Sequence, residues 1–226
     1  SNLKTVKDDY LLKVVPFPAS GDKTGKVLKP AVVGATAKSN PEFVLKQLGF
    51  QVTNDLTAAE VLLNAGNADL IKTKPYIGFG RSGMSLFKSA GVAEGFDYKA
   101  ENAYEGLYRA VFDQDSAITA PYEAEDYLYT NTGSYITAVP KEAKVIATIK
   151  DAADFYVAGW WPTHAAAQGK TAGFTYAKDG VNATIFASDS FNKDHPQAQF
   201  RLMAEAVYAA SAPAAEGSMD DGPRTR

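Results

Sequence analysis

The feature that most constrains the fold is the alternation of short apolar runs with helical segments between residues 30 and 91. The run Ala31–Ala35 is continuously apolar, which is typical of a strand buried on both faces of a parallel sheet. A helix should follow, with Asn40 as its N-cap, Pro41 in its first turn and Gly49 as its stop. The segment therefore begins with a strand, a loop and a helix.

The same pattern continues to residue 91. We expect a strand at Phe50–Thr53, a short helix at Thr57–Ala65, a strand at Pro75–Phe79 that runs into a glycine turn, and a helix at Ser82–Ala90 that stops at Gly91. Three strands that alternate with three helices predict a doubly wound, mostly parallel α/β sheet of the flavodoxin-like kind.

After residue 100 the sequence changes to short aromatic and β-branched runs, which predict an antiparallel or mixed extension of the sheet. Thr171–Ala177 and Val181–Ala187 flank Lys178-Asp179-Gly180, a strong hairpin signal. A final helix at Gln197–Ala210 should pack on the sheet. The expected organisation is a lead-in strand or linker at 1–29, one α/β domain at 30–210 and a disordered tail at 211–226.

Composition excludes several classes of function. The 226 residues contain 23 Lys and Arg against 26 Asp and Glu, a net charge of −3, and no block of like charge. Nucleic acid is therefore not an expected partner, and no apolar run is long enough for membrane insertion. The chain has no cysteine, which excludes disulfides, thiolate zinc sites and cysteine nucleophiles. The two histidines, His164 and His195, lie in no metal-binding pattern, so we expect no metal and no cofactor.

Candidate chemistry concentrates in the turn Gly78–Gly83, because α/β folds bind ligands between a parallel strand and the next helix. As G-x-G-x-x-G it matches a dinucleotide fingerprint, but it lies on the wrong strand and lacks a second strand ending in an acid. Gly80–Gly83 is one residue short of the G-x-S-x-G nucleophile elbow. Ser82 could still act with His164 or His195, which leaves a serine-dependent hydrolase as an alternative function.

Pro75–Met84 resembles the elbow of class I glutamine amidotransferases, P-x-x-G-x-C-x-G-x-Q. Gly80 stands where that family has cysteine, Ser82 where it has glycine and Met84 where it has glutamine. His195-Pro196-Gln197 is similar to the family's late His-Pro-Glu. Because glycine has no side chain to attack a carbonyl, amidotransferase chemistry is excluded.

The span from residue 30 to residue 210 more closely resembles the degenerate amidotransferase-like domain appended to some secreted bacterial zinc carboxypeptidases of the M14 class. The residues that carry this likeness are Glu105–Leu107, Ser116–Tyr122, Ala158–Trp160, Gly180–Phe191 and Gln199–Leu202. The resemblance implies a non-catalytic accessory or binding domain, an extracellular or periplasmic location, and a peptidase catalytic domain in the same polypeptide. The peptidase's own zinc pattern, H-x-x-E, is absent from this chain.

The expected pocket is the crevice at the end of the Pro75–Phe79 strand. Arg81 at a helix N-terminus could hold a carboxylate or phosphate, although a solvated Arg81 is an equal alternative. The candidate pocket residues are Gly78, Gly80, Arg81, Ser82, Thr36 and His195.

Two further groups have a functional and a structural interpretation. Trp160 and Trp161 could form an aromatic contact surface for a peptide or carbohydrate. We favour instead one tryptophan in the core and one over a loop. The acidic concentration could bind calcium, but a solvated loop suits its spacing better; its members are Asp113, Asp115, Glu123, Glu125 and Asp126.

Overall fold

The computed structural model describes residues 31–211, except 102 and 193–196. The predicted leader at 1–29, His195 and most of the predicted tail lie outside these residues. Ser211, which we assigned to the tail, is the last residue of the final helix. In the described ranges, no helix is long and apolar enough to cross a membrane.

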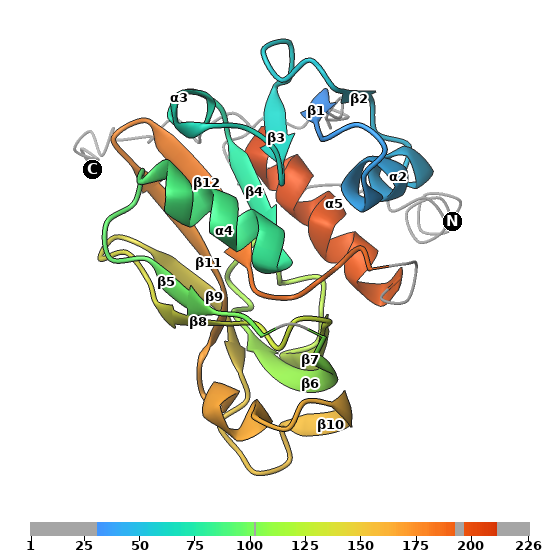
Figure 1. Cartoon of the computed structure of the whole chain (residues 1–226), viewed down its shortest axis with the longest axis vertical. Coiled ribbons are helices and arrows are strands. Elements are labelled where there is room, and N and C mark those ends of the chain that lie inside the picture. The colour runs from blue at the N-terminus through green and yellow to red at the C-terminus, as the bar shows by residue number, and fades with distance from the viewer. Residues whose placement is uncertain (1–30, 102, 193–196, 212–226) are drawn as a thin grey trace, which may run out of the picture.

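In the described residues, twelve strands form one mixed sheet, in which the main path runs β10-β6-β9-β11-β12-β4-β3-β1-β2 (Figure 1). The parallel part contains β1 (Val33–Gly34), β2 (Val52–Thr53), β3 (Val61–Leu63) and β4 (Tyr76–Phe79). The antiparallel part contains β5 (Asp97–Lys99), β6 (Glu105–Phe112), β7 (Glu125–Thr130), β8 (Tyr135–Ala138), β9 (Lys144–Ile149), β10 (Tyr156–Trp160) and β11 (Thr171–Lys178). β12 (Val181–Phe186) joins the two parts, since it pairs antiparallel with β11 and parallel with β4.

The predicted doubly wound sheet with an antiparallel extension is confirmed. The helices are α2 (Asn40–Gln47), α3 (Ala68–Ile71), α4 (Gly80–Ala90) and α5 (Gln197–Ser211), with a 3-10 turn η1 (His164–Ala167). α4 and α5 cover opposite faces of the sheet (Figure 1). Alternate residues of β3 and β4 therefore belong to two different hydrophobic cores, one on each face of the sheet. Leu63 and Ile77 pack with α5, while Leu62 and Tyr76 pack with α4.

Two local predictions were wrong. Thr57–Ala65 contains the buried strand β3 rather than a helix, because its apolar run is continuous and periodicity cannot separate a short buried strand from a buried helix. The N-cap of α2 is Ser39, not Asn40: the Glu42 backbone N–H donates to Ser39 Oγ at 3.3 Å. Asn40 is the first helical residue, so the cap lies one position earlier than expected.

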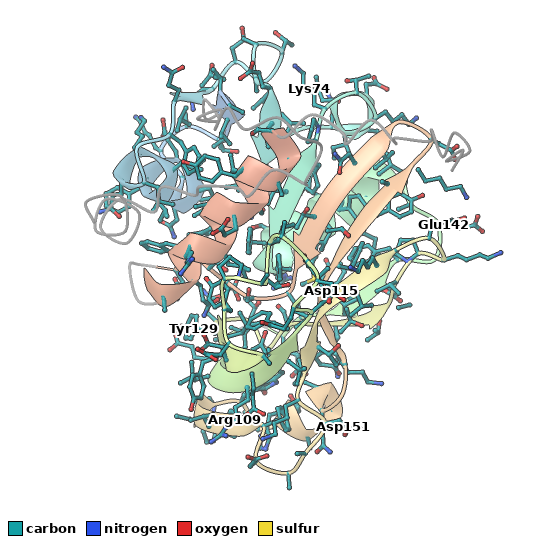
Figure 2. The ribbon with its side chains drawn as sticks, turned by 180° about the vertical axis from the view of Figure 1, so that it is seen from behind. Lys74, Arg109, Asp115, Tyr129, Glu142 and Asp151 are labelled. Carbon is teal, nitrogen blue, oxygen red and sulfur yellow. The ribbon has the colours of Figure 1, made fainter. Side chains whose placement is uncertain are left out.

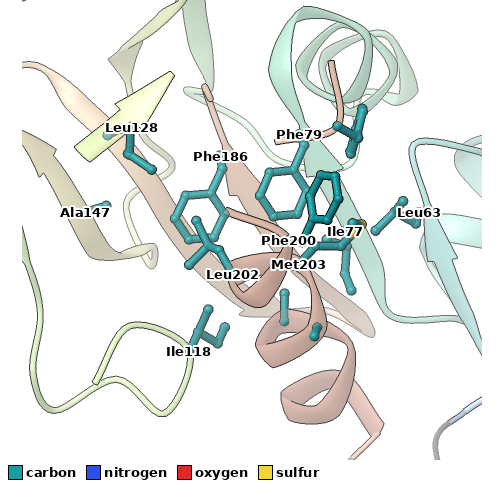
Figure 3. Close-up of a cluster of buried hydrophobic side chains, with 14 of the residues drawn as sticks. Leu63, Ile77, Phe79, Ile118, Leu128, Ala147, Phe186, Phe200, Leu202 and Met203 are labelled. Carbon is teal, nitrogen blue, oxygen red and sulfur yellow. The ribbon is translucent and has the colours of Figure 1, made fainter. Parts of the chain in front are cut away.

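The hairpin and the final helix form as predicted. Asp179 and Gly180, with φ of 51° and 84°, make the turn between β11 and β12, since both central positions adopt the left-handed conformation that this sequence favours. α5 buries its apolar stripe on β3 and β4. Figure 3 shows Phe200 and Met203 of that stripe beside Phe79 and Phe186.

We predict that Phe200→Ala destabilises the protein by about 3 to 5 kcal/mol. Phe200 is 7% exposed, and truncation leaves a cavity between α5 and the sheet. Chemical denaturation measures the change. Phe43→Ala is the control, because Phe43 is 56% exposed on α2 and its loss should change the free energy of unfolding by less than about 0.5 kcal/mol. Equal effects of the two substitutions would contradict the assignment of α5 to the core.

Candidate functional site

The turn between β4 and α4 has the geometry of a nucleophile elbow. The helix begins directly after the strand, and Gly80 is its first residue, with φ of +62°. Only glycine adopts this conformation without steric cost. The glycine turn expected after the Pro75–Phe79 strand is therefore confirmed, while the helix begins at Gly80 rather than at Ser82.

Glycines also let α4 approach β4 closely. A Cβ at Gly83 would lie 2.6 Å from the Gly78 Cα, a distance that real Cβ atoms do not show. The buried Tyr76 hydroxyl donates to the Gly83 carbonyl at 2.8 Å and so joins β4 to the first turn of α4. Gly78 and Gly83 thus serve backbone packing and Gly80 provides the turn, which accounts for the G-x-G-x-x-G pattern without a dinucleotide.

The side chain of Asn64, at the carboxyl end of β3, forms hydrogen bonds with two residues of the turn. Its side-chain amide donates to the Phe79 carbonyl and to Ser82 Oγ, both at 2.9 Å, and its carbonyl accepts from the Phe79 N–H at 2.7 Å. Asn64 has φ of +47°, a conformation that asparagine tolerates better than most residues. Ser82 is therefore paired with an amide, a partner that cannot act as a general base.

Asp189 occupies the space in front of Gly80. The residue follows β12, and its Oδ1 lies where a side chain at position 80 would begin. Its Oδ2 accepts from the Asn131 N–H at 2.9 Å, from Thr130 Oγ1 at 3.2 Å and from Thr132 Oγ1 at 3.3 Å. Burial raises the pKa of Asp189, and these hydrogen bonds oppose the rise. A carboxyl group thus stands where a side chain at position 80 would lie.

A cleft of about 610 Å³ opens above this turn, a volume suited to a small molecule. The N-terminal ends of α2 and α4 form two of its walls. Most of its lining residues carry a hydroxyl, an amide or a charge, and the full set is Thr36, Ser39, Asn40, Pro41, Asn64, Arg81, Ser82, Ser85, Asn131, Thr132, Asp189, Phe191 and Asn192.

The structure brings part of the predicted site together. Thr36, Arg81 and Ser82 line the cleft, whereas Gly78 lies within β4 and Gly80 lies against Asp189. His195 lies outside the described residues. Asn64 and Asp189 were missed by sequence reasoning, although each follows the carboxyl end of a strand, where ligand-binding residues gather in such sheets.

The other predicted residues lie elsewhere. His164 lies in η1, which follows β10; its Nδ1 is 2.7 Å from the Trp161 carbonyl oxygen, and its ring stacks on Tyr156 at 4.1 Å. Trp161 is 1% exposed, so it cannot contribute to a contact surface, while Trp160 is 70% exposed. The structure thus corrects the paired tryptophan surface and agrees with the favoured alternative of one tryptophan in the core.

The acidic residues from Asp113 to Asp126 do not converge on one point. Asp113 pairs with Lys144 at 2.8 Å, and Glu125 pairs with Arg109 at 3.2 Å. Within the described ranges, no three His, Asp or Glu side chains lie close enough to share a metal ion.

Comparison with known proteins identifies the fold. No protein family model and no curated protein matches the sequence. A Thermoplasma acidophilum protein, provisionally assigned as a component of GMP synthase, is 14% identical, with a TM-score of 0.53 over 81% of this chain and 94% of that one. A glutamine amidotransferase from Thermotoga maritima is 9% identical, with a TM-score of 0.51 over 80% and 97% of the two chains. At these identities the matches show a class I glutamine amidotransferase-like fold.

We predict that Gly80→Cys destabilises the protein and does not restore the shape of an amidotransferase site, since its Cβ would overlap Asp189 Oδ1. Gly80→Ala measures the destabilisation that a Cβ alone causes at this position, and Gly91→Ala is the matched control. Gly91 has φ of +63° but nothing within 4 Å of its added Cβ, so its substitution costs only the backbone conformation, about 1 to 2 kcal/mol.

Gly80→Ala should lower the free energy of unfolding more than Gly91→Ala does, as measured by chemical denaturation. Asp189→Ala combined with Gly80→Ala should recover part of the difference, because the overlap is then removed. Equal losses at the two glycines would contradict the position of Asp189.

Proposed function

We propose that this chain is a non-catalytic ligand-binding domain with a class I glutamine amidotransferase-like fold. The observation that carries the proposal is the geometry of the β4–α4 turn: Gly80 is the first residue of the helix, and the Asp189 carboxyl fills the space in front of it. Glycine cannot form a covalent intermediate, and the sequence holds no cysteine that could replace it. A cleft with hydrogen-bonding residues but without a nucleophile at the β4–α4 turn suits binding rather than acyl transfer.

The ligand that this cleft suits is small and rich in hydrogen-bonding groups, such as a peptide end or a carbohydrate. Many of its lining residues carry a neutral hydroxyl or amide group. The Arg81 guanidinium and two helix N-termini favour a carboxylate or phosphate at one end of the ligand. The Asp189 carboxyl, on the other side of the turn, favours a hydrogen-bond donor.

We further propose that the domain accompanies a secreted M14-type zinc carboxypeptidase in the same polypeptide. The support is the sequence resemblance, which spans residues 30–210. The coding sequence that precedes residue 1 tests this proposal. An H-x-x-E zinc motif with a distant histidine there would support it, and an unrelated sequence would remove it.

A fluorophosphonate probe distinguishes a binding domain from the alternative, a serine-dependent hydrolase. We expect no labelling of Ser82, because its Oγ accepts from the Asn64 amide and no imidazole in the described ranges is hydrogen-bonded to it. Ser82→Ala is the control, and after exposure to the probe neither protein should gain the mass of an adduct in intact-mass spectra. Labelling that disappears in Ser82→Ala would overturn the non-catalytic proposal.

Thermal-shift measurements with free sugars and with di- and tripeptides test the binding proposal. A ligand at about 100 times its Kd stabilises the folded state by about 2.7 kcal/mol, which corresponds to a rise in Tm of about 5 to 10 °C for a chain of this size. Arg81→Ala should reduce the rise for carboxylate-bearing compounds and leave neutral sugars less affected. The proposal fails if no compound of either class stabilises the wild-type protein.

A further inference from the structure

Asp189 supplies the negative charge of the cleft. Among the described residues that line it, Asp189 carries the one carboxyl group and Arg81 the one basic group. Most of the others offer a neutral hydroxyl or amide. Asp189 is partly exposed, so a ligand in the cleft can reach it.

The hydrogen bonds to Asp189 leave one of its oxygens able to accept a further donor. Thr130 Oγ1, Thr132 Oγ1 and the Asn131 N–H all donate to Oδ2. When the Asn131 side-chain amide is oriented so that both of its atoms are satisfied, its nitrogen lies 2.9 Å from Oδ2 and 3.2 Å from Oδ1. A carboxylate has about four lone-pair sites on its two oxygens. Oδ1 therefore keeps acceptor capacity for a ligand.

Backbone contacts fix the position of this carboxyl group. The Asp189 N–H donates to the Tyr129 carbonyl oxygen of β7 at 2.9 Å. Gly80, which has no side chain, leaves the space that Oδ1 occupies. A group that is already held in place binds a ligand without a further cost of ordering.

No cation of the described residues neutralises this carboxylate. Burial raises the pKa of Asp189, and the groups that lower the pKa are hydrogen-bond donors of Thr130, Asn131 and Thr132, with no Lys or Arg among them. These donors favour the ionised form, because an ionised carboxylate only accepts hydrogen bonds. Charges withdrawn from water are normally paired with an opposite charge. A cationic group on the ligand would supply that partner.

An ammonium group fits this position better than a hydroxyl group. A neutral hydroxyl would leave the charge of Asp189 uncompensated. An ammonium group adds to the hydrogen bond the attraction between opposite charges, which is stronger where water is excluded. It also carries three N–H donors, and the hydroxyl oxygens of Ser82 and Thr132, which line the same cleft, can accept from those that Asp189 does not take.

We propose that the ligand of the cleft carries a primary ammonium group and that Asp189 is the residue that binds it. The inference rests on the proposed function, because it names the ligand class of the same cleft. The free amine of a peptide and the amine of an amino sugar share this chemistry. Arg81 repels a cation, so we expect the ammonium end of the ligand to lie on the Asp189 side of the cleft.

Calorimetric titration of the full 226-residue chain with matched pairs of compounds tests the inference. Glucosamine is compared with glucose, and alanyl-alanine with lactoyl-alanine. Within each pair one ammonium group is replaced by a hydroxyl group of similar size. We expect at least one amine to bind with a Kd about tenfold lower than that of its hydroxyl partner. The pair that shows this preference distinguishes an amino sugar from a peptide.

Asp189→Asn removes the charge and keeps a side-chain oxygen that can accept from Thr130 and Thr132. In this variant the ratio of the two Kd values should fall to about one. Asp115→Asn is the matched control, because Asp115 is exposed in the loop between β6 and β7 and does not line the cleft (Figure 2). It should keep the wild-type ratio. A purely structural role of Asp189 would change the affinity for both members of a pair alike and leave their ratio unchanged.

Circular dichroism and the Tm of each variant establish that it is folded. Equal binding of both members of each pair by the wild type overturns the inference and leaves the proposed binding function standing. A preference for the amine that persists in folded Asp189→Asn, or that is lost equally in Asp115→Asn, also overturns it. If Asp189→Asn does not fold, the ratio measured for the wild type decides. If none of the four compounds binds, the inference fails, and the proposed function is judged by the wider panel of sugars and peptides.

Discussion

The parallel pairing of β4 with β12 is the interaction on which the rest of the structure depends. β12 is the one strand of the described sheet that pairs parallel with the first half and antiparallel with the second. The register sets Phe186 opposite Phe79, and their rings stack at 5.2 Å in the core beneath α5. On the other face, Ile185 and Tyr76 belong to the core beneath α4. One pair of strands therefore connects both cores and both halves of the sheet.

The same register builds the candidate site. Since Phe186 lies beside Phe79, the chain that leaves β12 reaches Gly80 within three residues, and the residue at that point is Asp189. The parallel pairing of β3 with β4 brings Asn64 to the other side of the turn in the same way. The cleft is thus a product of strand order, because the carboxyl ends of parallel strands meet at one edge of the sheet.

Local signals predicted the elements whose structure is set locally. The Pro41 start of α2, the Gly91 stop of α4 and the turn at Asp179-Gly180 each follow from a backbone preference of one or two residues. β3 could not be recognised in this way, because three buried apolar residues carry no periodicity. Asn64 and Asp189 were missed for a related reason: their roles depend on pairings between strands far apart in the sequence. The sequence predicted the location of the site, at the end of β4, but not all of the side chains that form it.

The turn between β4 and α4 keeps its shape without a side chain at residue 80, because no contact that holds the turn depends on one. Asn64 bonds to the backbone of Phe79, Tyr76 bonds to the carbonyl of Gly83, and the helix rests on the bare Cα of Gly78. Each of these contacts positions backbone, and none uses the side chain of residue 80. Glycine there even removes the strain that a side chain would bear at positive φ. The turn, the helix N-termini and the cleft thus stand without a side chain at position 80, and these are the features on which the proposed ligand binding depends.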